Sequence, residues 1–346
     1  IISGKEKMKI YKVGGAIRDS LLEINASDND WVVVGSSPKE MIAEGYKPIG
    51  KDFPVFLHPE TNEEYALART EKKSGTGYHG FTFYFGKDVS LEDDLSRRDF
   101  TINAMAEDES GEIIDPFNGR EDLNNKIFRH VSDAFYEDPL RAIRLARFYT
   151  YDHLKDFTID DETLNSIKKI ISSGEIAKLS PDRVWSETSR ALNSSNPNLY
   201  FEKIISLSLL DPFFINLIVP NCDSHSDQEV RWSELQINNN FNLGKNLPIP
   251  NEFKNASSVL KNISKITDNT KEEDLISIIK GSHFIRNEEI ITKLCTLPNL
   301  KENKEFVLRI KKEIKNTDFS FLSDTPNEKV EAEKIKIYEE IIHKCK

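Results

Sequence analysis

A strand–helix–strand unit near the start of the chain, with glycines at its first turn and carboxylates at its second, constrains the fold most strongly. The apolar run that ends at Val13-Gly14-Gly15 leads into a helical segment, Gly15 to Leu22. The next apolar run, Trp31 to Gly35, directly follows Asp28-Asn29-Asp30. Glycines let a backbone approach a phosphate closely, and a helix N-terminus supplies N–H donors. The pattern predicts an α/β module with an anion-binding turn.

The carboxylates of Asp28 and Asp30 form a candidate metal site. Side chains alternate along an extended segment, so both should point the same way. Two such carboxylates repel each other unless they share a cation, and hard oxygen ligands suit Mg²⁺, which also binds substrate phosphates. Without context, a solvated acidic turn is the commoner explanation of such a pair. Gly15 and Arg18 favour the metal site, because they add a triphosphate cradle to the same unit.

The second cluster begins with Arg97-Arg98-Asp99 and precedes an apolar stretch. Paired arginines suit bidentate contacts to phosphate. Asp99 and Asn103 lie four residues apart, so they are predicted to share a helix face, where they could grip a ribose or brace Arg98. A surface ion-pair cluster is the alternative.

The third cluster lies in the predicted helix from Asp138 to Tyr149. Arg141, Arg144 and Arg147 recur every three residues and form one drifting stripe, with Asp138 on the same side. A carboxylate accepts hydrogen bonds and a guanidinium only donates them. Because cytosine and adenine present an amino donor beside a ring-nitrogen acceptor, Asp138 and Arg141 could bind them and reject uracil and guanine. The other two arginines would serve phosphates or stacking; a solvated face is the alternative.

Composition bounds the class of protein. The net charge of the 346 residues is −11, which counts against a nucleic-acid binder unless the cations cluster locally. No apolar run approaches the roughly 20 residues that a membrane helix needs, and the first ten residues do not predict a secretory signal. The three cysteines, Cys222, Cys295 and Cys345, are far apart and predict neither disulfides nor a metal site. A cytoplasmic protein is therefore expected.

The chain changes character after the turn-rich segment 115–119. Residues 163–171 and 181–192 are predicted helices, and Ser180-Pro181 is a typical start for the second. A polar, linker-like region is predicted at 221–228. The fold expected is α+β, with a mixed sheet and helices first and an almost wholly helical remainder.

Together these blocks resemble the class II tRNA nucleotidyltransferase and poly(A) polymerase family, within the polymerase-β-like superfamily, and most closely its CCA-adding branch. The segments that carry the resemblance, over residues 9–190, are VGGAIRDSLL, DNDWVVVG, EEYALARTEKKSG, LEDDLSRRDFTINAMA, EIIDPFNG, EDPLRAIRLARF and LSPDRVWSE. The resemblance implies a polymerase-β-like head over residues 1–140, a helical neck that selects the nucleotide over 141–215, and a helical body and tail that bind tRNA over 216–346.

The resemblance also implies roles for single residues. Asp28 and Asp30 would be catalytic and would hold the Mg²⁺ ions. Residues 69–80 would form a flexible loop that switches selection from C to A. The residues expected to contact the nucleotide are Gly15, Arg18, Arg98, Asp138, Arg141, Arg144 and Arg147.

The implied reaction adds C, C and A to the 3′ end of tRNA from CTP and ATP, without a nucleic-acid template, and releases pyrophosphate. The enzyme is expected to act as a monomer and to have no membrane partner. Poly(A) polymerase, a CC-only or A-only enzyme, and an inactive RNA-binding relative are the alternatives. The chain departs from its relatives after about residue 215: it has no His-Asp dipeptide, so we expect a shortened or degenerate body without phosphohydrolase activity.

Overall fold

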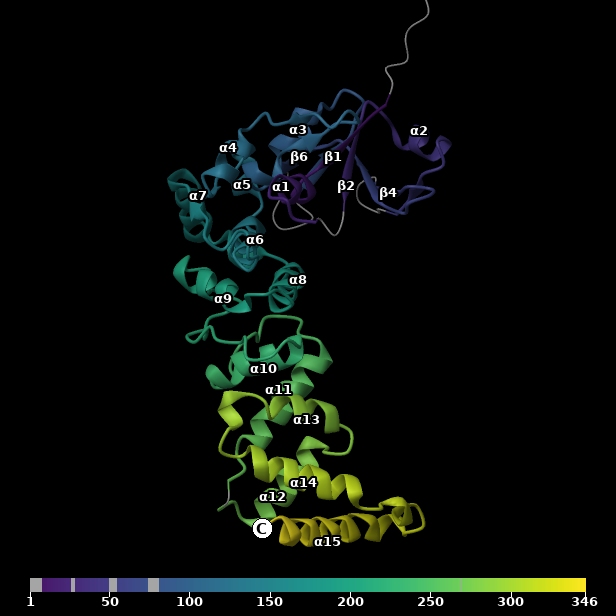
Figure 1. Ribbon diagram of the computed structural model, residues 1–346, viewed down its shortest axis with the longest axis vertical. Coiled ribbons are helices and arrows are strands. Elements are labelled where there is room, and N and C mark those ends of the chain that lie inside the picture. Colours follow the sequence, from purple (N-terminus) through teal and green to yellow (C-terminus); the bar gives the residue numbers. More distant parts are fainter. Residues whose placement is uncertain (1–7, 26–28, 50–54, 74–80, 268) are drawn as a thin grey trace, which may run out of the picture. The chain divides into compact units, whose positions relative to one another are not determined.

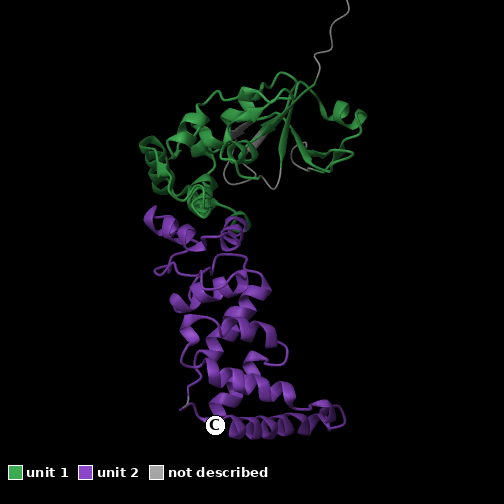
Figure 2. Cartoon of the chain, viewed as in Figure 1, with its two compact units in different colours: residues 1–183 green, residues 184–346 purple. Residues whose placement is uncertain are grey.

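The computed structural model describes residues 8–25, 29–49, 55–73, 81–267 and 269–346. The chain forms two compact units, residues 1–183 and 184–346 (Figure 2). The three-part division at residues 140 and 215 stays a prediction. No helix among the described residues is long and apolar enough to cross a bilayer.

The first unit is built on a mixed sheet, as predicted (Figure 1). Among the described residues the strand order of this sheet is β3-β4-β5-β2-β1-β8-β9. Strand β1 is antiparallel to both β2 and β8, whereas β2 runs parallel to β5. The strands are β1 (Lys9–Val13), β2 (Asp30–Val34), β3 (Lys47–Pro48), β4 (Val55–Leu57), β5 (Glu64–Leu67), β8 (Ala106–Glu107) and β9 (Ile113–Ile114).

The register of the central strands positions the site. Val13, the last residue of β1, pairs with Asp30 on one side and with Ala106 on the other. Gly14 then turns the chain into α1 (Gly15–Leu21). Residues that are far apart in sequence therefore meet at one end of β1: the start of β2, the start of α1 and the segment that leads into β8.

Helices and two short pairs of strands complete the first unit. The helices are α2 (Pro38–Ala43), α3 (Leu91–Ser96), α4 (Gly119–Asn124), α5 (Ala134–Glu137), α6 (Leu140–Phe148) and α7 (Asp161–Ser172). The strand pairs are β6 (Thr70–Lys73) with β7 (Phe81–Tyr84), and β10 (Ile127–Phe128) with β11 (Thr158–Ile159). Phe100 packs edge-on against Phe128, Phe135 and Phe148, at centroid distances of 5.4, 5.5 and 5.8 Å. This buried aromatic cluster fixes α6 beside the segment that carries the paired arginines.

The second unit is helical in its described residues, and the predicted helix at 181–192 is confirmed as α8. Helix α8 begins in the last residues of the first unit. The helices are α8 (Pro181–Leu192), α9 (Pro197–Ser206), α10 (Gln228–Asn238), α11 (Asn251–Ile263), α12 (Glu272–Ser282), α13 (Glu288–Leu294), α14 (Lys304–Asn316) and α15 (Asn327–Cys345). The apolar faces of α10 to α15 bury a common core that includes Leu260, Ile279, Ile310 and Ile342.

The segment 221–228 is not the linker that its polarity predicted. Cys222 is buried, and its backbone N–H donates a 2.7 Å hydrogen bond to Oδ1 of Asn198. The backbone N–H of Ser224 donates a 3.0 Å hydrogen bond to Oε2 of Glu234. The polar side chains in and around the segment satisfy its backbone and hold it against the helices.

Candidate active site

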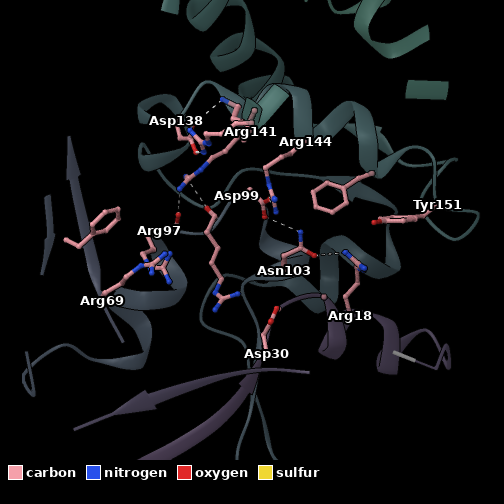
Figure 3. Close-up of a pocket in the computed structure, with 17 residues that line it drawn as sticks. Arg18, Asp30, Arg69, Arg97, Asp99, Asn103, Asp138, Arg141, Arg144 and Tyr151 are labelled. Carbon is pink, nitrogen blue, oxygen red and sulfur yellow. Dashed lines mark hydrogen bonds and ion pairs between the residues drawn. The ribbon is translucent and has the colours of Figure 1, made fainter. Parts of the chain in front are cut away.

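The end of β1 opens into a cavity of about 480 Å³, formed wholly by residues of the first unit (Figure 3). Charged side chains dominate its lining. Among the described residues, the charged side chains that line it are Arg18, Arg69, Arg97, Arg98, Arg141, Arg144 and Arg183, with Asp30, Asp99 and Asp138. The excess of guanidinium groups makes the cavity suited to a polyanion such as a triphosphate.

Gly14 lines the cavity at the turn between β1 and α1. Its φ of 79° and ψ of −141° lie in a region that only glycine adopts readily. A Cβ atom at this position would lie 3.0 Å from Nη1 of Arg98 and 3.9 Å from Oδ2 of Asp30. The sequence singled out Gly15, which also lines the cavity, but the conformation that requires glycine belongs to Gly14.

Asp30 is the described half of the predicted metal pair, and Asp28 lies outside the described residues. Within the described chain, no hydrogen bond or ion pair engages the Asp30 carboxylate, which faces the cavity (Figure 3). An acidic side chain that lines a cavity without a protein partner is a fitting ligand for a hard divalent cation. No group of three His, Cys, Asp or Glu residues among those described could hold a metal by itself.

A hydrogen-bonded network crosses the floor of the cavity from α1 to α6. Nη1 of Arg18 donates to Oδ1 of Asn103 at 2.7 Å, and Nδ2 of Asn103 donates to Oδ1 of Asp99 at 3.1 Å. Oδ2 of Asp99 accepts from Nε of Arg144 at 3.0 Å. Burial raises the pKa of Asp99, but Arg144 and Asn103 outweigh this and hold the pKa at about 2. Asp99 and Asn103 thus brace Arg18 and Arg144, and the prediction that they could brace Arg98 is wrong.

The support of Arg98 is Asp94, a residue that sequence reasoning missed. The Asp94 side chain is fully buried and accepts from Nη2 of Arg97 at 2.7 Å, from Nη2 of Arg98 at 3.2 Å and from the backbone N–H of Arg69 at 3.2 Å. Burial raises the pKa of Asp94, but the two guanidinium groups lower it below its ordinary value. The sequence spacing could have identified Asp94 as this partner, because it lies three and four residues before the paired arginines.

Asp138 precedes α6 and is not part of it, contrary to the predicted helix start. Its φ of −114° and ψ of 95° are extended. The next residue is Pro139, whose ring disfavours the α conformation of the residue before it. The Asp138 carboxylate accepts from Nη2 of Arg183 at 2.8 Å and from Nη1 at 3.2 Å. Arg183, in the first turn of α8, is a cavity residue that the sequence analysis did not single out. The sequence pointed to Arg183 only in that it lies in LSPDRVWSE, one of the segments that carry the family resemblance.

The three arginines of α6 differ in their surroundings. Arg141 is buried and donates to the carbonyl oxygens of Arg97 and Arg98, so it lies between the arginine pair and Asp138. Arg147 is also buried; it donates to the Tyr151 hydroxyl, with its guanidinium 4.7 Å from the ring centroid of Phe148. The solvated-face alternative is therefore wrong for both.

The cavity collects most of the residues predicted to bind nucleotide. Gly15, Arg18, Arg98, Asp138, Arg141 and Arg144 line it, together with Asp30; Arg147 is not among its lining residues. Of the loop predicted at 69–80, Arg69 lines the cavity, residues 70–73 form β6, and 74–80 lie outside the described chain. The roles assigned to all these residues stay predictions.

Comparison with known protein families agrees with this geometry. Residues 10–129 match the model of the "Poly A polymerase head domain", and residues 156–219 match that of the "Probable RNA and SrmB- binding site of polymerase A". Together the two matches span more than half of the chain, which belongs to the poly(A) polymerase family that both models describe. As a member of this family it is a nucleotidyltransferase.

Solved structures show the same fold over nearly the whole chain. A Bacillus stearothermophilus CCA-adding enzyme in complex with CTP is 22% identical, with a TM-score of 0.70 over 97% of this chain and 89% of that one. A tRNA-processing enzyme in an apo form is 21% identical, with a TM-score of 0.61 over 97% and 93%. A Thermotoga maritima CCA-adding enzyme complexed with tRNA is 20% identical, with a TM-score of 0.58 over 98% and 90%. The polymerase-β-like head followed by helices, predicted from the sequence, is therefore confirmed.

Proposed function

We propose that this nucleotidyltransferase adds C, C and A to the 3′ end of tRNA, using CTP and ATP without a nucleic-acid template and releasing pyrophosphate. One observation carries the proposal: a single cavity holds a carboxylate without a partner among the described residues, a set of anchored arginines, and the Asp138 and Arg141 side chains. The first two suit phosphoryl transfer, and the third suits the choice of a base.

The carboxylates of Asp30 and Asp28 would hold Mg²⁺. Asp30 fits this role because its oxygens face the arginine-lined cavity without a partner among the described residues. When bound, the metal would neutralise triphosphate charge and make the tRNA 3′-hydroxyl a better nucleophile at neutral pH. In the reaction the 3′-hydroxyl attacks the α-phosphorus in line, and the bond to pyrophosphate breaks.

The arginines bind and orient the triphosphate. Arg98 is anchored by the buried Asp94, and Arg18 by Asn103, so both guanidinium groups are held before the substrate arrives. Donors fixed in this way need no reorganisation as negative charge shifts to the leaving pyrophosphate. The in-line geometry therefore depends on side chains that do not themselves touch the nucleotide.

Asp138 and Arg141 choose the base. The Asp138 carboxylate accepts from the amino group of cytosine or adenine, while Arg141 donates to the neighbouring ring nitrogen. Uracil and guanine would turn a carbonyl oxygen towards the carboxylate and a ring N–H towards the guanidinium, so that acceptor would face acceptor and donor would face donor. Since Arg141 also donates to the carbonyls of Arg97 and Arg98, base choice and triphosphate binding share one support.

tRNA is the proposed polynucleotide substrate. Duplex RNA is read by its shape and backbone, a task suited to an extended set of helices such as those after residue 183. The Thermotoga maritima CCA-adding enzyme of the same fold was solved with tRNA, which supports this substrate.

The test is incubation of tRNA that lacks its terminal CCA with labelled CTP and ATP, supplied singly and together. Addition of two residues with CTP alone, and of a third and last residue when ATP is also present, is the expected result. A long A tail with ATP alone would instead identify a poly(A) polymerase. A stop after CC in the presence of both nucleotides would identify a partial enzyme, and so would A addition to a second substrate, tRNA ending in CC, without any addition to tRNA lacking CCA. No product under any condition would refute the proposal.

A further inference from the structure

A second cavity, of about 380 Å³, lies wholly in the second unit, against α10, α11 and the loop between them. Lys245, Lys254 and Lys261 line it, and no acidic residue of the described chain does so. The net charge of the whole protein is −11, so a cavity whose charged lining residues in the described chain are all lysines departs locally from the overall negative charge. We call it the lysine pocket.

The three lysines are exposed and have no ion-pair partner among the described residues. This distinguishes them from several other lysines of the same unit. Lysines paired with a carboxylate there include Lys280 with Glu331, Lys293 with Asp227, Lys315 with Glu288 and Lys336 with Glu333. The charge of the lysine pocket is therefore available to a ligand from outside the chain.

The loop over the pocket has an unusual and well-supported backbone. Asn240 and Phe241 adopt the left-handed conformation, with φ of 57° and 55°, which is uncommon for residues other than glycine. The buried Gln236 exchanges hydrogen bonds of 3.1 and 3.2 Å with the backbone of Leu243 and holds the loop in place. Such supported strain is concentrated at functional sites.

The positions of the cations favour a linear polyanion over a single phosphate. Lys254 and Lys261 are seven residues apart on α11, so they share one face at a separation of about 10 Å along the axis. Lys245 lies on the loop that borders the same pocket. The hydroxyl of Ser257 already donates to the carbonyl of Phe253 at 2.9 Å, and Gln236 is occupied by Leu243. A lone phosphate would find few converging donors, whereas successive phosphates of a nucleic-acid strand could each meet one lysine.

We propose that the lysine pocket binds the phosphate backbone of the RNA substrate. The proposal rests on the proposed function, because it names the surface of the second unit that tRNA contacts. These contacts would position the RNA and carry no information on its sequence.

The test compares two variants of the full chain that lose the same charge. K245Q/K254Q/K261Q removes the lysine pocket, and K280Q/K315Q/K336Q removes three ion-paired lysines of the same unit. Affinity for tRNA lacking CCA is measured by fluorescence anisotropy from 50 to 300 mM salt, with thermal unfolding to verify folding. The pocket variant should bind at least tenfold more weakly near 50 mM salt, with a slope of log K against log salt smaller by about 2–3. The control should stay within about twofold of wild type.

Several outcomes would overturn the proposal. Equal loss of affinity in both variants would assign the effect to net charge, and no loss in either would show that RNA does not use the pocket. Normal tRNA affinity with lost binding of inorganic phosphate, measured by calorimetry, would make the pocket a small-anion site. Binding is measured apart from nucleotide addition. Wild type that binds tRNA but adds no nucleotide would therefore refute the proposed function alone.

Discussion

Asp99 shows how a single buried carboxylate organises the cavity. Its oxygens join Asn103 on one side to Arg144 on the other, and its pKa is about 2 where the ordinary value is 3.8. A carboxyl whose folded-state pKa is depressed stabilises the fold above its unfolded-state pKa. That contribution is lost as the pH falls through the folded-state value.

Asp99→Asn should therefore lower the free energy of unfolding by about 2 kcal/mol at pH 7, since each pKa unit corresponds to about 1.4 kcal/mol. The same loss is expected at pH 5, and it should shrink as the pH falls from about 4 towards 2. Denaturant titrations of wild type and variant at pH 7, 5 and 3 measure this directly. A difference that is the same at all three values would contradict the assigned charge state.

Arg141→Ala should blur the choice of base. The expected change is a fall of about 10²-fold or more in the preference for CTP and ATP over UTP and GTP, because the ring-nitrogen acceptor loses its donor. Competing incorporation into tRNA lacking CCA measures the ratio. Arg190→Ala, at an arginine that is 63% exposed in its side chain, is the matched control and should leave the ratio unchanged. If the Arg141→Ala variant kept its preference for CTP and ATP, the proposed base-reading role of Arg141 would be refuted.

The sequence predicted which residue types the cavity would collect, and it predicted few of their partners. Arg18, Arg98 and Arg141 stood out because guanidinium groups beside glycines or carboxylates form recognisable motifs. The Asp138–Arg183 ion pair spans 45 residues, and the Arg18–Asn103 hydrogen bond spans 85, so neither can be read from spacing. Such partners depend on how the elements pack.

At the scale of elements, the turn between β1 and α1 carries the greatest geometric demand. Gly14 must adopt a backbone conformation that excludes a side chain, while Arg98 approaches it from another segment. The antiparallel register of β1 and β2 then brings Asp30 to the same turn. The strand–helix–strand pattern predicted this juxtaposition correctly.

Gly14→Ala should move Arg98 and lower kcat/KM for CTP by on the order of 10²-fold, since misplacement by about 1 Å can cost that much. Gly111→Ala is the matched control. Gly111 also has a positive φ, of 85°, but a Cβ there would meet nothing within 4 Å. It should cost about 1–2 kcal/mol of stability and leave kcat/KM unchanged. Equal kinetic effects of the two variants would show that backbone strain, and not contact with Arg98, is responsible.

Elements with a clear apolar pattern and a recognisable start were predicted well, and two-residue strands were not. Strand β2 and helices α1, α7 and α8 lie within a few residues of their predicted bounds. The two-residue strands β10 and β11 carry too few side chains to show alternation, and their parallel pairing depends on packing. Asp138 fell outside α6 because of a local proline effect that the helical pattern concealed.

At the scale of the whole molecule, net charge was a poor guide to the ligand. The chain carries −11 overall, yet it concentrates arginines around one cavity and, around another, lysines that have no ion-pair partner among the described residues. Outside these cavities acidic residues pair with cations, as Glu331 does with Lys280. Asp30, Asp99 and Asp138 line the first cavity, whereas no acidic residue of the described chain lines the second. This charge distribution fits the proposed substrates, a nucleoside triphosphate in the first cavity and an RNA backbone at the second.

The central claim, that the arginine-lined cavity transfers nucleotides to tRNA, is tested most directly by single-turnover addition of labelled CTP to tRNA lacking CCA. Wild type is compared with Asp30→Asn, which keeps the size of the side chain and removes its charge. Wild type should add two C residues, and the variant should be slower by about 10³-fold or more, because the carboxylate proposed to hold the metal is lost. Near-normal addition by Asp30→Asn would contradict the account.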